Sequence, residues 1–153
     1  MKKWILRLAG AMALAFVLVA LLAWLTLRAS LPTLDGSLMV AGLDAGVSIE
    51  RDAEGIVTIT AASRADAAFA TGFAHGQARF LHMDLFRRRS AGELSPLVGA
   101  MALDVDRRFR LHRFRSRAQA SLAALPAGDL QILEDYAAGV HAGLASLGGI
   151  PFE

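Results

Sequence analysis

An unbroken apolar run dominates the first part of the chain, because residues 8–27 contain no charged side chain. Twenty helical residues extend about 30 Å, which is close to the hydrocarbon thickness of a bilayer. Trp4 and Trp24 lie near the two ends of the run, where interfacial aromatic residues are common. The pattern therefore predicts a transmembrane helix within residues 1–30.

The charges that flank this run predict its orientation. Lys2, Lys3 and Arg7 precede it, whereas Arg28 alone follows closely. Because the more basic flank stays in the cytoplasm, we expect a single-pass membrane protein with its N-terminus in the cytoplasm and the part after residue 30 outside it.

A cleaved signal peptide is the alternative interpretation of residues 1–30. Such a peptide has an apolar core of about 7–15 residues and small residues at positions −3 and −1 of the cleavage site. Here the run is longer, and cleavage after Ala29 or Ser30 would place Leu27 or Arg28 at −3. We therefore favour an uncleaved anchor.

Alternation of apolar and polar residues follows the anchor. Residues 31–46 are rich in Gly, Pro, Ser and Asp and are expected to form a tether with one short edge strand. Residues 47–51 and 56–60 then alternate on either side of a four-residue turn, which is typical of a β-hairpin. Its buried face is expected to hold Val47, Ile49, Val57 and Ile59.

Helical spacing replaces the alternation after residue 62. Ser63 is expected to cap a helix, with Asp66 completing a short variant of the capping box. Apolar positions continue as far as Phe86, and three arginines at 87–89 suit the negative end of the helix. Gly92 and Pro96 are expected to break the chain.

Two further helices are expected after this break. Residues from about 103 to 124 are rich in arginine and are predicted to be helical, although their period is poor. The last helix should start after Pro126 and end at Gly148 and Gly149. Its apolar stripe comprises Leu133, Tyr136, Val140, Leu144 and Leu147.

One hairpin and about three helices make a small α+β unit. A two-stranded hairpin is marginally stable unless other elements pack on it, and these helices are too few to cover both faces of a sheet. We therefore expect residues 47–153 to be part of a larger fold.

The charge balance argues against a nucleic-acid partner. Residues 1–30 hold four of the sixteen Lys and Arg and none of the fourteen Asp and Glu, so residues 31–153 carry a net charge of −2. Nucleic-acid binding would require a positive surface potential. The chain has no cysteine, which excludes a disulfide, a thiolate metal site and a cysteine nucleophile within it.

Two clusters could suggest metal chemistry. His75 and His82 lie seven residues apart on one predicted helix face, with Asp84 nearby, but helical metal sites use spacings of three or four. Asp104 and Asp106 lack the further oxygen ligands that calcium needs. We therefore predict no metal ligand and interpret the histidines as packing or surface residues.

The remaining candidates also favour structural roles. Ser63 is expected to be a cap and Ser146 a residue of the last helical turn, and neither lies in a Gly-x-Ser-x-Gly motif. The arginine-rich segment could bind nucleic acid or lipid headgroups, but a solvated helix face or pairing with acids elsewhere is the preferred interpretation. It comprises Arg107, Arg108, Arg110, Arg113, Arg115 and Arg117. No catalytic residue is predicted in this chain.

Four segments, taken in order, resemble the penicillin acylase family. Residues 47–61 resemble its opening hairpin, with Arg51, Asp52 and Gly55 at the turn, and residues 70–89 resemble its first helix. The segments 92–110 and 136–142 continue the pattern. The matched positions of the helix are Gly72, Gln77, Arg79, Met83, Arg87 and Arg88.

This resemblance implies a function and a division of the chain. Residues 1–30 would be the anchor, 31–46 the tether, and 47–153 the beginning of an α-subunit of an αββα N-terminal-nucleophile hydrolase. Family members cleave themselves, and the new N-terminal serine of the β-subunit then attacks a linear amide of a penicillin or an acyl-homoserine lactone. The resemblance also implies calcium in the full-length enzyme, with ligands beyond Glu153.

Two alternatives remain open at this point. The chain could be a membrane-anchored interaction module without catalytic activity. Its apolar anchor contains no charged side chain over residues 8–27, and its last predicted helix ends at two glycines. It could also be the relic of an inactivated gene. The resemblance favours the N-terminal piece of an amide hydrolase that requires its β-subunit.

Overall fold

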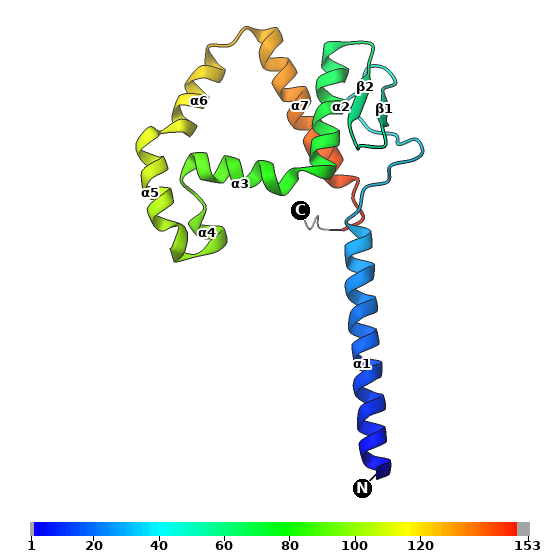
Figure 1. Ribbon diagram of the computed structural model, residues 1–153. Coiled ribbons are helices and arrows are strands. Elements are labelled where there is room, and N and C mark those ends of the chain that lie inside the picture. Colours follow the sequence, from blue (N-terminus) through cyan, green and yellow to red (C-terminus); the bar gives the residue numbers. More distant parts are fainter. Residues whose placement is uncertain (1, 150–153) are drawn as a thin grey trace.

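The structure is a computed structural model that describes residues 2–149. Figure 1 shows three parts: the isolated helix α1, a body that contains the hairpin with α2 and α7, and an arm that extends from the body. We define the arm as residues 79–124 and the body as residues 31–78 and 125–149. The fold is rich in helix, and its one sheet has two strands within the described residues.

Helix α1 (Lys2–Ala29) forms the stalk of the molecule. Its segment Arg7–Ala29 is long and apolar enough to cross a membrane, and none of this segment is buried within the protein. The expected long apolar helix is therefore present as one continuous element.

The tether is packed on the body rather than extended from it. Residues 31–46 contain turns and coil but no strand, so the predicted edge strand was wrong. Instead, the backbone N–H of Asp44 donates to Oδ1 of Asp66 at 2.9 Å. Gly42 has a φ of +105° and lies against the ring of Phe69. Its lack of a side chain permits this contact, since a Cβ there would meet the ring.

The hairpin is confirmed, with β1 (Ser48–Arg51) antiparallel to β2 (Val57–Thr60). Oδ1 of Asp52 closes the turn by accepting from the N–H groups of Glu54 and Ile56. Val57 was expected to be buried but is exposed, since it belongs to the pair nearest the turn, opposite Arg51.

Helix α2 (Arg64–Ala78) begins as predicted and ends early. Ser63 caps it, because its Oγ accepts from the N–H of Asp66 at 3.0 Å. The predicted continuous helix to residue 89 was wrong: Arg79 leaves the helical conformation, and α3 (Phe80–Ala91) starts in a new direction (Figure 1). The apolar positions that were expected on one helix are therefore divided, with Phe69 buried in the body and Phe86 exposed on the arm.

Helix α7 (Ala127–Ala145) runs in the same sense as α2, crosses it obliquely and forms the core with it (Figure 1). It starts after Pro126 as predicted but ends at Ala145, before the glycines at 148 and 149. Leu133 belongs to the predicted apolar stripe but is exposed, and the close contacts of the glycines with α2 lie farther along α7, at Tyr136, Gly139, Val140 and Gly143. The buried apolar side chains of the pair are Phe69, Ala70, Phe73, Ala74 and Val140.

Glycines let these two helices approach with their backbones in contact. Carbonyl oxygens of the facing helix occupy the place that a Cβ would take at each of four glycines, at 1.9 to 2.3 Å from its ideal position. Each helix carries two of them four residues apart, which puts both on one face. They are Gly72 and Gly76 on α2, and Gly139 and Gly143 on α7.

The arm contains α3, α4 (Ser95–Val98), the 3-10 turn η1 (Ala100–Ala102), α5 (Leu103–His112) and α6 (Phe114–Ala123). Gly92 ends α3 in the left-handed conformation, as expected, whereas Pro96 lies in the first turn of α4. The single arginine-rich helix predicted for about 103–124 was wrong. Arg113 adopts a φ of +53° and divides it into α5 and α6.

Candidate binding cleft

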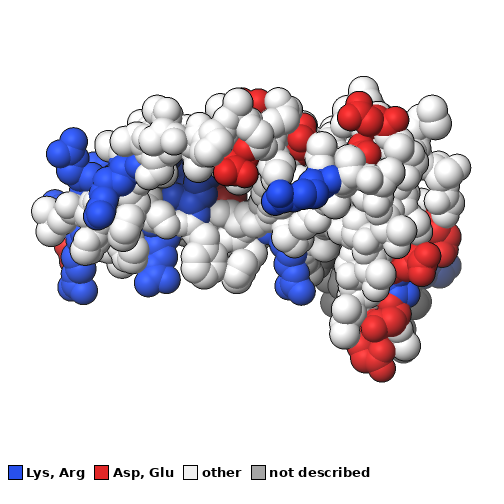
Figure 2. Space-filling model, turned by 90° about the horizontal axis from the view of Figure 1, so that it is seen from above, with Lys and Arg blue, Asp and Glu red and all other residues white. Residues whose placement is uncertain are grey.

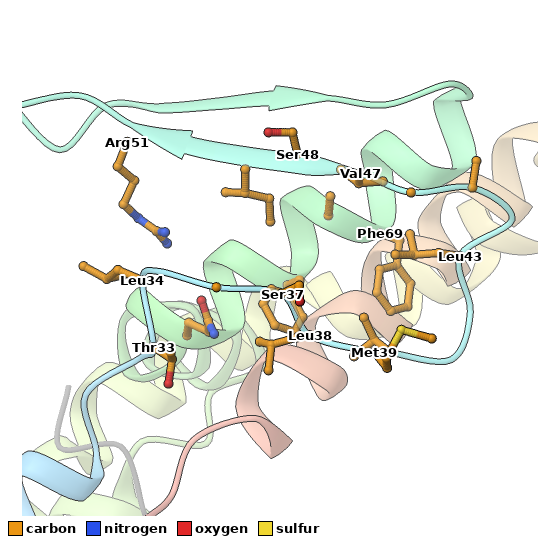
Figure 3. Close-up of a pocket in the computed structure, with 18 of the residues that line it drawn as sticks. Thr33, Leu34, Ser37, Leu38, Met39, Leu43, Val47, Ser48, Arg51 and Phe69 are labelled. Atoms are coloured by element: carbon orange, nitrogen blue, oxygen red, sulfur yellow. The ribbon is translucent and has the colours of Figure 1, made fainter.

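A cleft of about 640 Å³ lies between the tether, β1 and α2. Figure 3 shows Thr33 and Leu34 at one end, Leu43 near the other, and Phe69 of α2 on the inner wall. Because the tether folds back onto α2, a segment that composition marks as a linker forms one complete wall of the cleft.

Apolar side chains make up most of this lining. The tether contributes Leu34, Leu38 and Met39, which are all exposed, while α2 contributes the buried rings of Phe69 and Phe73. A concave surface of this size and character suits an apolar ligand or a protein segment.

The longest polar side chains of the lining come from β1 and α2. Arg51 projects from β1 toward the tether near Leu34 (Figure 3) and is half-buried. Gln77 lies at the end of α2, where its Nε2 donates to Oγ of Ser146 at 3.0 Å. The Ser146 hydroxyl in turn donates to the carbonyl of Gly143, so the amide of Gln77 is fixed by α7.

Asp66 holds the tether wall in place. Its buried carboxylate accepts from the Asp44 N–H and from the Ser63 hydroxyl. The hydrogen bond from Asp44, followed by that from Ser63, holds the pKa of Asp66 below its ordinary value. The carboxylate is therefore charged at neutral pH, and its role is to connect the tether to the N-terminus of α2.

His75 and His82 do not share one helix face, so that prediction was wrong. The break at Arg79 places His75 on α2 and His82 on α3. Nδ1 of His75 lies 2.8 Å from the Tyr136 hydroxyl, and the His82 ring packs on Phe86 with centroids 4.8 Å apart. Both histidines thus have packing partners.

The two aspartates of the arm have separate roles. Asp104 is exposed and pairs with Arg107 at 3.4 Å, whereas Asp106 is buried and accepts from the N–H groups of Leu94 and Ser95, both at 2.8 Å. Burial raises the pKa of Asp106, but the hydrogen bonds from Ser95 and Leu94 together outweigh burial and lower it. Asp106 therefore fixes the start of α4.

The arginines and serines singled out from the sequence also have structural partners. Arg110 donates to the Gly92 carbonyl at 2.9 Å, and Arg115 pairs with Glu93. Ser63 is confirmed as the cap of α2, and Ser146 lies directly after α7. Within residues 2–149 no three His, Cys, Asp or Glu side chains gather as metal ligands would.

Sequence reasoning missed the residues that build the cleft and its support. Arg51 and Gln77 were noted only as positions of a family pattern, and the glycine faces of α2 and α7 were not recognised. A signal for those faces was present, because Gly72 and Gly76, and Gly139 and Gly143, both show the small-x-x-x-small spacing of close helix pairs.

Comparisons with known proteins are consistent with one family. Residues 46–153 match the family model described as penicillin amidase. Penicillin acylase 2 proenzyme of Pseudomonas sp. (strain SE83) is 40% identical over 127 residues, which cover 83% of this chain and 16% of that protein. Acyl-homoserine lactone acylase QuiP of Pseudomonas aeruginosa is 34% identical over 113 residues, covering 74% of this chain and 13% of that protein.

A solved structure shares the fold. The thermostable penicillin G acylase from Alcaligenes faecalis superposes with a TM-score of 0.58 and 27% identity, covering 63% of this chain and 52% of the solved chain. The chain therefore spans a small part of the curated relatives and about half of the solved chain.

Proposed function

The chain belongs to the penicillin amidase family, and on that premise we propose that it is the N-terminal part of the α-subunit of a self-processing amide hydrolase. The intact precursor hydrolyses a linear amide bond between an acyl group and an amine-bearing moiety. The observation that carries the proposal is the family match over 46–153, together with relatives named for penicillins and acyl-homoserine lactones.

The nucleophile in this proposal lies on a β-subunit of the same precursor. Its N-terminal serine attacks the amide carbonyl while its own α-amino group, with a reference pKa near 8, accepts the proton. Backbone or side-chain donors would stabilise the oxyanion of the tetrahedral intermediate. This division agrees with the structural roles of Ser63 and Ser146 described above.

The lengths of the relatives support cleavage of the precursor. The match to penicillin acylase 2 proenzyme covers 83% of this chain but 16% of the proenzyme. The match to the solved penicillin G acylase chain covers less of this chain, 63%, but as much as 52% of the solved chain. The solved chain is thus far shorter than the proenzyme, as expected if family members are cut into an α-subunit and a β-subunit.

The contribution of this chain is to enclose and shape the acyl site. The cleft presents mostly apolar side chains, and Arg51 and Gln77 are among its polar groups. Its tether wall is held by Asp66. We propose that the β-subunit packs against this surface. The acyl group that the complete site accepts is then set jointly by both subunits.

The proposal places no calcium ion on this part of the chain. Within the described residues, Asp104 and Asp106 have separate roles and no acidic cluster gathers. This set does not fit a calcium ion, which needs six to eight oxygens, and we assign calcium no step here.

We propose that α1 remains uncleaved in the inner membrane, with the body and arm in the periplasm, because Lys2, Lys3 and Arg7 precede its apolar run.

Hydrolysis by the product of the complete reading frame tests the proposed function. That product should release amine from N-phenylacetyl or N-acyl-homoserine lactone substrates, whereas residues 1–153 alone should not exceed buffer, because the nucleophile is missing. Released amine is measured by derivatisation with a fluorogenic reagent.

The control for the complete product is cooperative thermal unfolding. For residues 1–153, which are expected to be part of a larger fold, the control is the helical signal in circular dichroism. Hydrolysis by residues 1–153 alone would overturn the proposal. Inactivity of a folded complete product toward the whole panel would also overturn it, and would favour the membrane-anchored interaction module.

A further inference from the structure

The charges of this protein are segregated between arm and body. The arm carries ten arginines and four acidic residues, a net charge of +6, whereas the body carries two arginines and nine acidic residues, a net charge of −7. Figure 2 shows basic side chains gathered over the arm at the left and acidic side chains over the body at the right. The near-neutral total of residues 31–149 therefore conceals a strongly basic surface.

Polar contacts, rather than an apolar core, hold the arm together. Within residues 79–124, Ala102 is the buried apolar side chain. The helices are joined by Asp106 to Leu94 and Ser95, by Arg110 to Gly92, and by Arg115 to Glu93. These contacts leave apolar side chains exposed along α4, η1 and α5. They include Leu97, Val98, Met101, Leu103 and Leu111.

The outer end of α1 is fixed against the body, which sets the position of the arm relative to the anchor. Ser30 is 6% exposed, and Gly148 packs so closely on Ala29 that a Cβ there would lie 3.2 Å from the Ala29 carbonyl oxygen. Figure 1 shows that the arm hangs beside this junction, with α4 at the level of the outer end of α1. If α1 spans a bilayer, α4 is then at the height of the lipid headgroups.

We propose that the turn formed by α4 and η1, together with the adjoining arginines of α5, rests on the anionic surface of the membrane that holds α1. Met101, which is 85% exposed, and its apolar neighbours enter the interface, as the apolar face of an interfacial helix does. Arg107 and Arg108 pair with lipid phosphates, and the attraction falls off within a Debye length of the surface. This inference rests on the proposed membrane anchor.

Site-directed fluorescence tests the contact. The protein is the complete product in vesicles, with any cysteine beyond residue 153 replaced by serine, because residues 1–153 contain none. A fluorophore is attached at Met101→Cys, at Glu54→Cys in the hairpin turn as an exposed control, and at Ala13→Cys inside α1 as a reporter of the anchor. The vesicles contain either phosphatidylcholine alone or a mixture with phosphatidylglycerol, and each preparation carries lipid-bound nitroxide quenchers.

We expect lipid quenching at position 101 in anionic vesicles and its loss in neutral vesicles, in high salt and after Arg107→Glu with Arg108→Glu. Position 54 should remain unquenched throughout. Quenching at 13 without quenching at 101 would overturn the surface contact and leave the anchor intact. Quenching at neither position would overturn the anchor as well. A label at 101 that is shielded from both lipid and aqueous quenchers would show that a protein segment covers the turn, and would also overturn the inference.

Discussion

Replacing Gly139 with valine is expected to abolish cooperative unfolding of the body. The ideal Cβ at this position lies 1.9 Å from the carbonyl oxygen of Phe69, and this oxygen belongs to the backbone of α2. A side chain therefore fits only if the two helices separate, which uncovers Phe69 and Val140 together. Overpacking of a core costs about 1–3 kcal/mol and occasionally more, and we expect at least the upper value because no flexible side chain can yield.

Gly128→Val is the matched control for this substitution. Gly128 lies on the same helix, and nothing approaches its ideal Cβ within 4 Å, so valine there changes only helix propensity, by a few tenths of a kcal/mol. Thermal unfolding followed by circular dichroism at 222 nm measures both variants. Equal melting temperatures for the two variants would contradict the close packing of α2 against α7.

Gly92→Val is the second large effect, and we expect it to be confined to the arm. Gly92 ends α3 with φ of +70°, and its ideal Cβ would meet Cγ of Arg110 at 2.5 Å and the Asp106 carbonyl oxygen at 2.6 Å. The left-handed conformation costs roughly 1–2 kcal/mol for a residue with a Cβ, and the overlap adds about 1–3 kcal/mol. Because polar contacts hold the arm, this loss is expected to separate α3 from α5 while the body stays folded.

Trypsin digestion measures that separation, since the segment that contains α5, Arg113 and α6 holds six arginines. Gly55→Val supplies the control, because Gly55 has a similar φ of +80° with nothing within 4 Å of its ideal Cβ. It carries the backbone strain without the overlap. We expect rapid cleavage within residues 107–117 in Gly92→Val and wild-type cleavage there in Gly55→Val. Similar digestion patterns in the two variants would show that Gly92 does not join α3 to α5.

Local interactions explain the parts of the fold that the sequence predicted correctly. The hairpin depends on alternation and on a turn of four residues that Asp52 closes through its own neighbours. The start of α2 depends on Ser63 and Asp66, three residues apart. In each case the interacting groups lie close together in the chain, so their pattern is visible without knowledge of the tertiary structure.

Tertiary contacts explain the errors. The α2–α7 pairing joins Gly72 to Tyr136 and Phe69 to Gly139, and a single sequence gives no register for partners so far apart. The helices break at Arg79 and at Arg113, and neither break has a glycine or proline at its position. Both arginines adopt non-helical φ values, so the residue type does not predict the break. Leu133 continues a valid helical stripe but is exposed, because helical spacing alone does not show which part of a stripe a distant helix covers.

The cleft was missed for a related reason. Composition identifies residues 31–46 as irregular, but it does not show that they return to α2. That return depends on the hydrogen bond between the Asp44 N–H and the Asp66 carboxylate, and on the approach of Gly42 to Phe69. One wall of the candidate cleft is therefore formed by a segment that sequence reasoning assigned to a linker.

The position of the nucleophile is the central claim, and covalent labelling tests it most directly. The complete product is treated with a serine-reactive sulfonyl fluoride, separated under denaturing conditions, and mapped by mass spectrometry. We expect the adduct on the first serine of a longer chain, with residues 1–153 recovered unlabelled on a separate, shorter chain. An adduct on Ser63, Ser146 or another serine of residues 1–153, with loss of amide hydrolysis, would contradict the account.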